Sequence, residues 1–269
     1  MNRIDLVPVP HNSNVGDVLP YLEPTITEDC LLYADGEPIG FYLAKMPERM
    51  CKLADLADAE FMSANVPKTK MNRTSQIKKQ SARPVIIELY KDLPKGVSQM
   101  STQLGSIPPK PMVRRPYPQR SSVHLVKSAQ PFVKAMLLLA NESEQLIRDI
   151  MPEQHKRQLE AMNRVHNKWR CGNLWTSTIS NYNISADMHR DTGNIVGACN
   201  VIICKKHNSK GGDLYVPDYG AVFGQRDNSV LVYPAWRNLH GVTPIIPTHD
   251  GGYRNSHILY PLKAFVNLP

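Results

Sequence analysis

The last hundred residues, after Trp169, contain five short runs rich in β-branched and aromatic side chains, separated by Gly, Asn, Asp and Ser. Closely spaced short runs of this kind are typical of antiparallel strands in a barrel or jelly roll. The runs read LWTSTISNYNI, CNVIICK, GDLYVPDY, SVLVYPAW and SHILYPLKAFV. We therefore expect a double-stranded β-helix, a jelly-roll or cupin-like core, with the helices of the chain packed on its outside.

Two helices and a hairpin are predicted before this β region. Apolar residues follow helical spacing from Pro131 to Met151, and Pro131 suits the first turn of a helix. Near the N-terminus, CLLYADGEPIGFYLAK at 30–45 reads as two strands around an Asp-Gly turn. The predicted fold class is α+β, with a β-helix core, flanking helices and an N-terminal extension. A second helix is expected after Pro152, with three residues facing inward: Leu159, Met162 and Trp169.

Composition excludes several classes of protein. Hydrophobic residues make up 42% and charged residues 21% of the chain, which is ordinary for a globular protein and excludes disorder throughout. The longest apolar run, Ala135 to Ala140, is far below the ~18 residues of a membrane span, and the N-terminal residues lack the apolar core of a secretion signal. Five cysteines without a C-x-x-C pair support neither a disulfide framework nor a zinc ribbon. We expect a soluble protein of the reducing cytoplasm, with no membrane partner.

Charge divides the chain into three predicted segments. Residues 1–63 form an acidic segment of net charge −7 that packs on the core, residues 64–120 form a basic, loop-rich segment of net +10, and residues 121–269 carry the helices and the β core with net +5. A concentrated positive segment favours a polyanion such as DNA, because phosphate binding releases counterions. A solvated basic loop without a partner remains the alternative. The cations expected to contact the DNA backbone include Lys68, Lys70, Arg73, Arg114, Arg115 and Arg120.

The β region carries residues that suit a metal site. His189-x-Asp191 places an imidazole and a carboxylate on one face of a strand, because side chains two residues apart point the same way. His240 follows the strand-like SVLVYPAW and offers a third ligand. Two imidazoles and one carboxylate that leave three positions open are the arrangement of non-haem Fe(II) oxygenases. A structural role for His240 is the alternative.

Arg254-x-Ser256 follows the second histidine and suits a carboxylate ligand. The guanidinium fork and the hydroxyl lie two residues apart on one strand face, so both can bind the same carboxylate. The distal carboxylate of 2-oxoglutarate fits such a pair. A surface ion pair at Arg254 is the alternative.

At these residues the sequence resembles the 2-oxoglutarate- and Fe(II)-dependent dioxygenases, and within them the ten-eleven translocation and J-binding protein family, which oxidises the methyl group of 5-methylpyrimidines in DNA. The resemblance implies that His189, Asp191 and His240 form the catalytic Fe(II) site, that Arg254 and Ser256 hold 2-oxoglutarate, and that dioxygen is the further co-substrate. It covers Trp169 to Leu262 and rests on HRDTGN at 189–194, GGDLYVPDYGAVF at 211–223, LVYPAWRNLHGVTPI at 231–245 and YRNSHILY at 253–260.

The resemblance also implies two contacts to a base flipped out of a methylated duplex. Asn194 would lie against the base and Tyr260 would stack on it, and an enzyme that acts on a base methyl needs both kinds of contact. Leu262 stands where relatives can have a polar base contact, so part of the base edge must be read elsewhere. The proximal carboxylate of 2-oxoglutarate has three candidate ligands, Asn181, Asn183 and Arg170.

The predicted function is hydroxylation of 5-methylcytosine in DNA to 5-hydroxymethylcytosine, with further oxidation left open. The absence of a large cysteine-rich region before the catalytic part suggests a compact microbial or phage-type member, which would act in the cytoplasm, that of a bacterial host cell if it is phage-encoded. Three alternatives stay open: a thymine hydroxylase that forms 5-hydroxymethyluracil, an oxygenase of a protein or small molecule, and a non-enzymatic DNA-binding module. Protein partners are not predicted.

Overall fold

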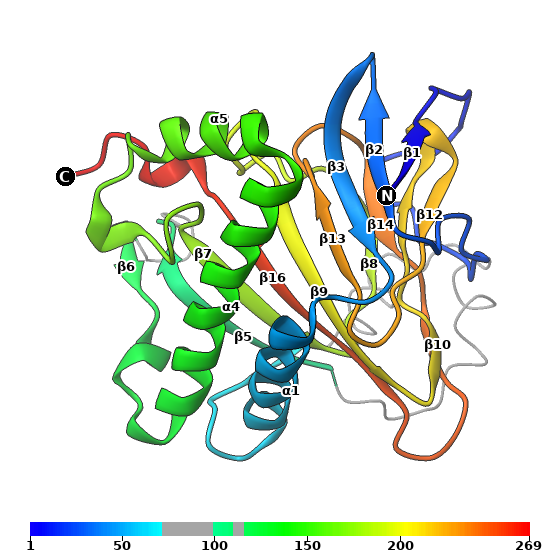
Figure 1. Ribbon diagram of the computed structural model, residues 1–269. Helices are drawn as coiled ribbons and strands as arrows, with labels where there is room; N and C mark the ends of the chain where they lie inside the picture. The colour runs from blue at the N-terminus through cyan, green and yellow to red at the C-terminus, as the bar shows by residue number, and fades with distance from the viewer. Residues whose placement is uncertain (72–98, 110–115) are drawn as a thin grey trace.

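A computed structural model describes residues 1–71, 99–109 and 116–269 of the chain. The predicted DNA contacts Arg73, Arg114 and Arg115 lie outside these residues. The described residues form three layers, with helices on one face of a large sheet and a smaller sheet on the other face (Figure 1).

The large sheet has ten strands, nine of which follow one another in space while the tenth pairs with β5. Most neighbours are antiparallel, and β1 with β2 is a parallel pair. In spatial order the strands are β1 (Asn2–Asp5), β2 (Cys30–Ala34), β3 (Glu37–Leu43), β13 (Val230–Tyr233), β9 (Asn200–His207), β16 (Tyr253–Tyr260), β7 (Ser177–Tyr182), β5 (Gln99–Ile107) and β4 (Thr69–Met71), with β6 (Gln119–Arg120) beside β5.

The small sheet has four antiparallel strands and faces the large one. A two-stranded ribbon extends the molecule beside it. The strands of the small sheet are, in spatial order, β12 (Ala221–Phe223), β11 (Leu214–Val216), β14 (His240–Val242) and β8 (Ala186–His189), and the ribbon consists of β10 (Ser209–Gly211) and β15 (Ile245–Pro247).

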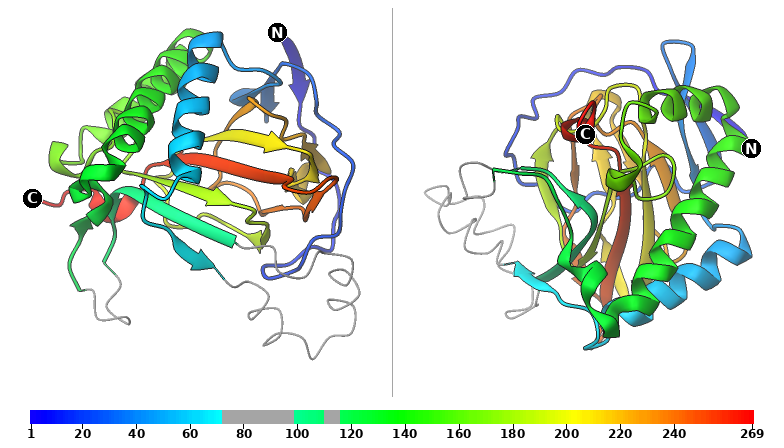
Figure 2. Two further views of the ribbon diagram at one scale, coloured as in Figure 1. Left: turned by 90° about the horizontal axis from the view of Figure 1, so that it is seen from below. Right: turned by 90° about the vertical axis from the view of Figure 1, so that its left-hand side faces the viewer.

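Among the described residues, three α-helices cover the outer face of the large sheet (Figure 2). They are α1 (Glu48–Met62), α4 (Gln130–Ile150) and α5 (Pro152–Met162), and short 3-10 turns lie at η2 (Ser122–Leu125), η3 (Lys127–Ala129), η4 (Asn167–Trp169), η5 (Pro217–Tyr219) and η6 (Lys263–Phe265). Within the described ranges no helix is long and apolar enough to cross a lipid bilayer.

Alternation along the strands produces two apolar layers. On β9, Val201 and Ile203 face the helices and join a core with Phe61 and Phe132, while Ile202 faces the small sheet and joins Phe223. Side chains that alternate across a strand can contribute to both layers, so the central strands are buried on both faces.

The predicted elements are largely present. The hairpin is β2 and β3, and its turn residues Asp35 and Gly36 have φ of 54° and 80°, as a tight primed turn requires. Both predicted helices form, at α4 and α5. Trp169 is not part of α5, because that helix ends at Met162; it is half-buried in η4 and packs on Phe265, with ring centroids 5.6 Å apart.

The sequence predicts only a small sheet in residues 1–63, whereas the structure also contains helix α1 there. Its buried residues recur at helical spacing, as Met50, Ala54, Ala57 and Phe61 do. The same N-terminal region also joins the core sheet directly, since β3 pairs with β13. The described part of the basic segment does so too, because β5 pairs with β7.

Candidate active site

A cavity of about 430 Å³ lies between the two sheets. This volume is within the usual range for a small-molecule site. The large sheet contributes alternate residues of β16 and the small sheet contributes the ends of β8 and β14. The four residues Arg254, Ser256, Ile258 and Tyr260 all line the cavity, as their spacing on one strand predicts.

The cavity brings His189, Asp191 and His240 together. His189 ends β8 and His240 begins β14, and the two residues are register partners with ring centroids 4.4 Å apart. Asp191 lies beyond the end of β8, so the turn after the strand, rather than strand alternation, directs its carboxylate. Each of the three side chains offers a ligand atom within 4.8 Å of the others, which makes them a candidate metal site.

Backbone carbonyls fix which nitrogen of each histidine is available. His189 Nδ1 donates to Asp187 O at 2.7 Å, and His240 Nδ1 donates to Asn238 O at 3.0 Å. Both rings therefore keep Nε2 as the ligand atom, which is the usual device for orienting metal-binding imidazoles. The donor set is two Nε2 atoms and a carboxylate, and it fits Fe(II) in the facial arrangement.

Two asparagine amides orient the carboxylate of Asp191. Asn200 Nδ2 donates to Asp191 Oδ2 at 3.0 Å, and Asn194 Nδ2 lies 3.3 Å from the same oxygen. Asn194 Nδ2 also donates to Asn200 Oδ1 at 2.8 Å, so the two amides hold each other. Asp191 Oδ1 is left facing His189 Nε2, at 3.6 Å.

The three side chains of the candidate metal site differ in their exposure to solvent. The side chains of His189 and Asp191 are 40% and 32% exposed, whereas His240 is buried. Burial, followed by the neighbouring His189, lowers the pKa of His240. The neutral imidazole is the form that binds metal, so this shift favours binding near neutral pH.

The pocket around Arg254 and Ser256 suits an anion. Arg254 Nε and Ser256 Oγ are buried and make no hydrogen bond within the described residues. Lys206 is the register partner of Arg254, and its Nζ lies 3.9 Å from the buried carboxylate of Asp213. Burial lowers the pKa of Lys206 and raises that of Asp213. Two cations against one carboxylate leave positive charge for a carboxylate ligand to balance.

The predicted base contacts also line the cavity. Tyr260 is half-buried, its hydroxyl accepts from Gln103 Nε2 at 3.0 Å, and burial raises its pKa to about 12. Asn194 and Leu262 form an antiparallel bridge and both line the wall. Tyr260 therefore presents an unionised ring next to a mixed polar and apolar wall.

The three candidate ligands for the proximal carboxylate of 2-oxoglutarate differ in whether they line the cavity. Asn181 lines the cavity and is the register partner of Ser256. Asn183 accepts from Arg254 N through Oδ1, at 2.9 Å, and does not line the cavity. Arg170 Nε donates to Val165 O at 2.9 Å and also lies outside it. Asn181 is the candidate whose position suits the role.

The described basic residues differ in their availability. Lys68 directs its ammonium to the carbonyls of Ser63 and Val66, and burial lowers its pKa. Lys70 is exposed on β4. Arg120 is exposed as well, and its guanidinium donates to Arg170 O at 3.0 Å.

Comparison with solved structures identifies the fold. The structure of NgTET1 in complex with 5mC DNA matches 96% of this chain and 85% of that chain, with a TM-score of 0.58 and 13% identity. At this level of identity the match shows that the two chains share a fold. No family model and no curated protein matches the sequence.

Two further solved structures match less closely. A 2OG-Fe(II) oxygenase family protein from Burkholderia pseudomallei matches 77% of this chain and 88% of that chain, with 14% identity and a TM-score of 0.37. A full-length protein of Neurospora crassa, in complex with alpha-KG, matches 87% of this chain and 75% of that chain, with 11% identity and a TM-score of 0.40.

Sequence reasoning missed the residues that support the site. Asn200 begins β9 and Gln103 lies in β5, and neither belongs to a short motif with the residue it supports. Asp187 and Asn238 act through backbone carbonyls, which every residue has. A spacing of two residues before each histidine is the only local signal that they share.

Proposed function

We propose that this protein is a 2-oxoglutarate- and Fe(II)-dependent dioxygenase that hydroxylates the methyl group of 5-methylcytosine in DNA. The observation that carries the proposal is one cavity that contains the His-Asp-His cluster together with Arg254 and Ser256, whose Nε and Oγ atoms have no hydrogen-bond partner among the described residues. The likeness to the fold of NgTET1, a structure determined with 5mC DNA, supports the choice of substrate.

In this proposal His189, Asp191 and His240 hold Fe(II), with both imidazoles neutral and Asp191 oriented by the amides of Asn194 and Asn200. Arg254 and Ser256 hold the distal carboxylate of 2-oxoglutarate. When bound, iron and 2-oxoglutarate supply the oxidation, in which dioxygen hydroxylates a C–H bond while 2-oxoglutarate is converted to succinate and carbon dioxide.

The remaining walls would hold the base. Tyr260 would stack on it, and Ile258 and Leu262 would exclude water from the methyl group. Phosphates on either side of the flipped base would contact the basic segment 64–120, of which Lys70 and Arg120 are described and exposed. DNA binding should therefore weaken steeply with salt.

The test is incubation of the iron-loaded protein with a duplex that contains 5-methylcytosine, followed by mass spectrometry of the nucleosides and measurement of succinate. We expect 5-hydroxymethylcytosine, and no product from His189→Ala or Asp191→Ala. His249→Ala removes an exposed histidine away from the cavity and is the matched control. Product formation by His189→Ala at the wild-type rate would exclude this metal site.

Thymine is the second candidate substrate, and one observation keeps it open. The side-chain hydrogen bonds of Asn194 use Nδ2, so its oxygen is what remains for a ligand. The N4 amine of cytosine and the N3–H of thymine are both donors, and an acceptor serves either. An unmethylated duplex of the same sequence, assayed for 5-hydroxymethyluracil, separates the two.

A further inference from the structure

An N-terminal strap, residues 9–26, joins the two open edges of the small sheet. At one edge Thr25 N and Ile26 N both donate to Val222 O of β12, at 2.9 and 3.0 Å. At the other edge Gly16 N donates to Met188 O of β8 at 2.7 Å, and Met188 N donates to Asp17 O at 2.8 Å. In Figure 2 this dark-blue segment runs along the side of the molecule away from α1 and α4. The strap therefore closes the sheet that contributes both candidate histidines.

The strap packs directly behind β14. Leu19 is buried in a small cluster with Met188 and Leu239. A Cβ atom on Gly241 would lie 2.8 Å from Leu19 Cδ1 and 2.9 Å from Ala186 O, so no other residue fits there unless its neighbours move. Gly241 follows His240 directly, so the strap packs against the residue next to the buried histidine.

A chain of hydrogen bonds runs from the strap to the ring of His240. His11 Nδ1 accepts from Ser13 N, so Nε2 carries the proton and donates to Asp218 Oδ1 at 2.8 Å. Asp218 Oδ2 accepts from Asn238 Nδ2 at 2.5 Å.

Asn238 is the last member of this chain. Its Oδ1 accepts from Tyr233 OH at 2.8 Å, so both ends of its amide are held. Its backbone oxygen is the acceptor for His240 Nδ1, at 3.0 Å. The position of that carbonyl sets the direction in which His240 Nε2 points.

The other histidine depends on the strap through the β8 edge. Met188 is bonded to the strap through both its N–H and its C=O, and it lies between Asp187, whose carbonyl orients His189, and His189 itself. An edge strand of four residues has few other constraints, because it is paired on one side only with β14.

We infer that the strap is a positioning element for the metal site, with His11, Asp218 and Asn238 as positioning residues for His240. The inference rests on the proposed function, because it assumes that His240 binds a metal. It assigns a role to the N-terminal residues, which lie far from the triad in the sequence.

The experiment measures Co(II) binding to the metal-free, full-length protein, by affinity and by the ligand-field bands that report coordination geometry. Loss of the side chain in Asn238→Ala should raise the dissociation constant roughly 10- to 100-fold and change the bands, as supporting residues of metal ligands typically do. The side chain of His11 is more exposed, so His11→Ala should raise the dissociation constant for Co(II) only about 1.5- to 5-fold. His11→Gln retains a donor and should restore most of the affinity.

Two controls separate positioning from loss of stability. Leu139→Ala removes a buried side chain of α4 and should lower Tm without changing the Co(II) affinity or bands. Val15→Ala changes an exposed strap residue outside the chain of hydrogen bonds and should change neither quantity. If Asn238→Ala does not fold, the pair of His11 variants decides the question.

The outcomes are distinct. Wild-type affinity and bands in both Asn238→Ala and His11→Ala would overturn the positioning role and leave the proposed function standing. Absence of Co(II) binding by the wild type, or wild-type binding by His189→Ala, would overturn the proposed function and the positioning role together.

Discussion

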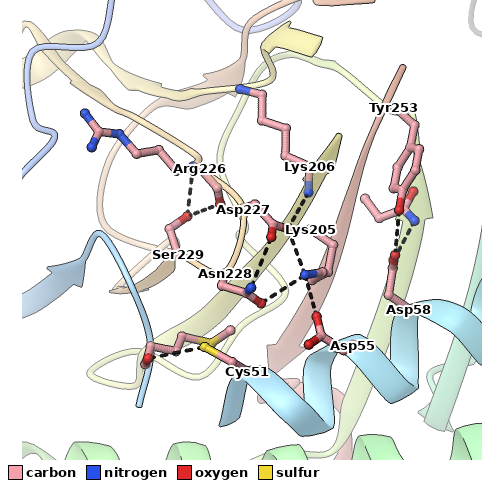
Figure 3. A network of polar contacts seen from close by, with 12 residues as sticks. Cys51, Asp55, Asp58, Lys205, Lys206, Arg226, Asp227, Asn228, Ser229 and Tyr253 are labelled. Carbon is pink, nitrogen blue, oxygen red and sulfur yellow. Dashed lines mark hydrogen bonds and ion pairs between the residues drawn. The ribbon is translucent and has the colours of Figure 1, made fainter. Parts of the chain in front are cut away.

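Strand β16 presents two chemically different faces. Its cavity face carries Arg254 and Ser256, whose Nε and Oγ atoms are buried without a hydrogen bond within the described part of the chain. Its helix face carries Asn255 and His257, which are also buried but attached to other elements: Asn255 Nδ2 donates to Asp58 Oδ1 of α1 at 2.6 Å, and His257 Nδ1 pairs with Ser180 Oγ at 2.7 Å, while Asn255 Oδ1 and His257 Nε2 have no hydrogen-bond partner among the described residues. Figure 3 shows Asp58 beneath Tyr253 and, one turn away, Asp55 reaching Lys205.

The comparison distinguishes a binding surface from a structural one. Ser180, His257 and Asp58 lie in the order of a nucleophilic triad, with His257 Nε2 3.5 Å from Asp58 Oδ1, yet all three are buried and none lines the cavity. Their role is to attach α1 to β16. Each helix-face side chain has one bond to a neighbouring element, whereas Arg254 and Ser256 line a cavity in which a ligand can supply the partners that Nε and Oγ lack.

Replacement of Arg254 tests the cavity face most strongly. Arg254→Leu should raise the KM for 2-oxoglutarate at least ~100-fold, because two charge-assisted hydrogen bonds are lost. Arg254→Lys keeps the charge without the fork and should fall between Leu and wild type. Steady-state kinetics with succinate as readout gives both values. An unchanged KM in Arg254→Leu would show that the anion binds elsewhere.

Replacement of Asp58 tests the helix face. Asp58→Ala should lower the free energy of unfolding by roughly 2–4 kcal/mol, because Tyr253 and Asn255 lose a buried acceptor. The KM for 2-oxoglutarate, measured at a temperature where the variant is folded, should stay at the wild-type value. A rise in KM as large as that of Arg254→Leu would mean that the two faces are not independent.

The same carboxylate predicts a pH dependence. Burial raises the pKa of Asp58, but the hydrogen bond and charge of His257, together with Asn255 and Tyr253, outweigh it, so the pKa lies below its usual value. The contribution of Asp58 to stability is therefore present above pH ~4 and is lost as the pH falls through the lower folded value. Denaturation of Asp58→Asn should show a weaker loss of stability in that acidic range.

Replacement of Ser256 is a smaller test of the cavity face. Ser256→Ala removes a buried hydroxyl that has no partner among the described residues, so the free energy of unfolding should stay unchanged or rise. The KM for 2-oxoglutarate should rise roughly tenfold, the value of one hydrogen bond to a charged group. A lower Tm with an unchanged KM would place Ser256 with the structural residues.

His124 sets the pH baseline for these measurements. Its Nε2 accepts from Gly105 N at 3.1 Å, and burial, followed by Arg120, lowers its pKa to about 4. Because the folded pKa is below the unfolded value of ~6.5, stability is complete above that pH and is lost as the pH falls from there to about 4. In His124→Gln the free energy of unfolding, measured by urea denaturation, should depend less on pH across this window. Its pH dependence in the more acidic range attributed to Asp58 should stay unchanged. If the variant's free energy of unfolding changed with pH as steeply as that of the wild type, the lowered pKa of His124 would be contradicted.

Short-range spacing made part of the site predictable. A period of two residues placed Arg254, Ser256, Ile258 and Tyr260 on one face, and the structure has all four at the cavity. The same reasoning placed Asp191 on a strand with His189, whereas β8 ends at His189. Helix α1 was missed because its buried face is made largely of small residues within an acidic segment, which is a weak apolar signal.

The sequence by itself determined which side chains could bind a metal and a carboxylate, because ligand chemistry and strand alternation are local properties. Only the tertiary structure decided what holds them in place. Asp58 and Asn255 are 197 residues apart, and His11 and Asp218 are 207 apart, yet each pair is joined by one hydrogen bond. A local pattern fixes the face on which a residue lies, while its partner across layers depends on how the whole chain packs.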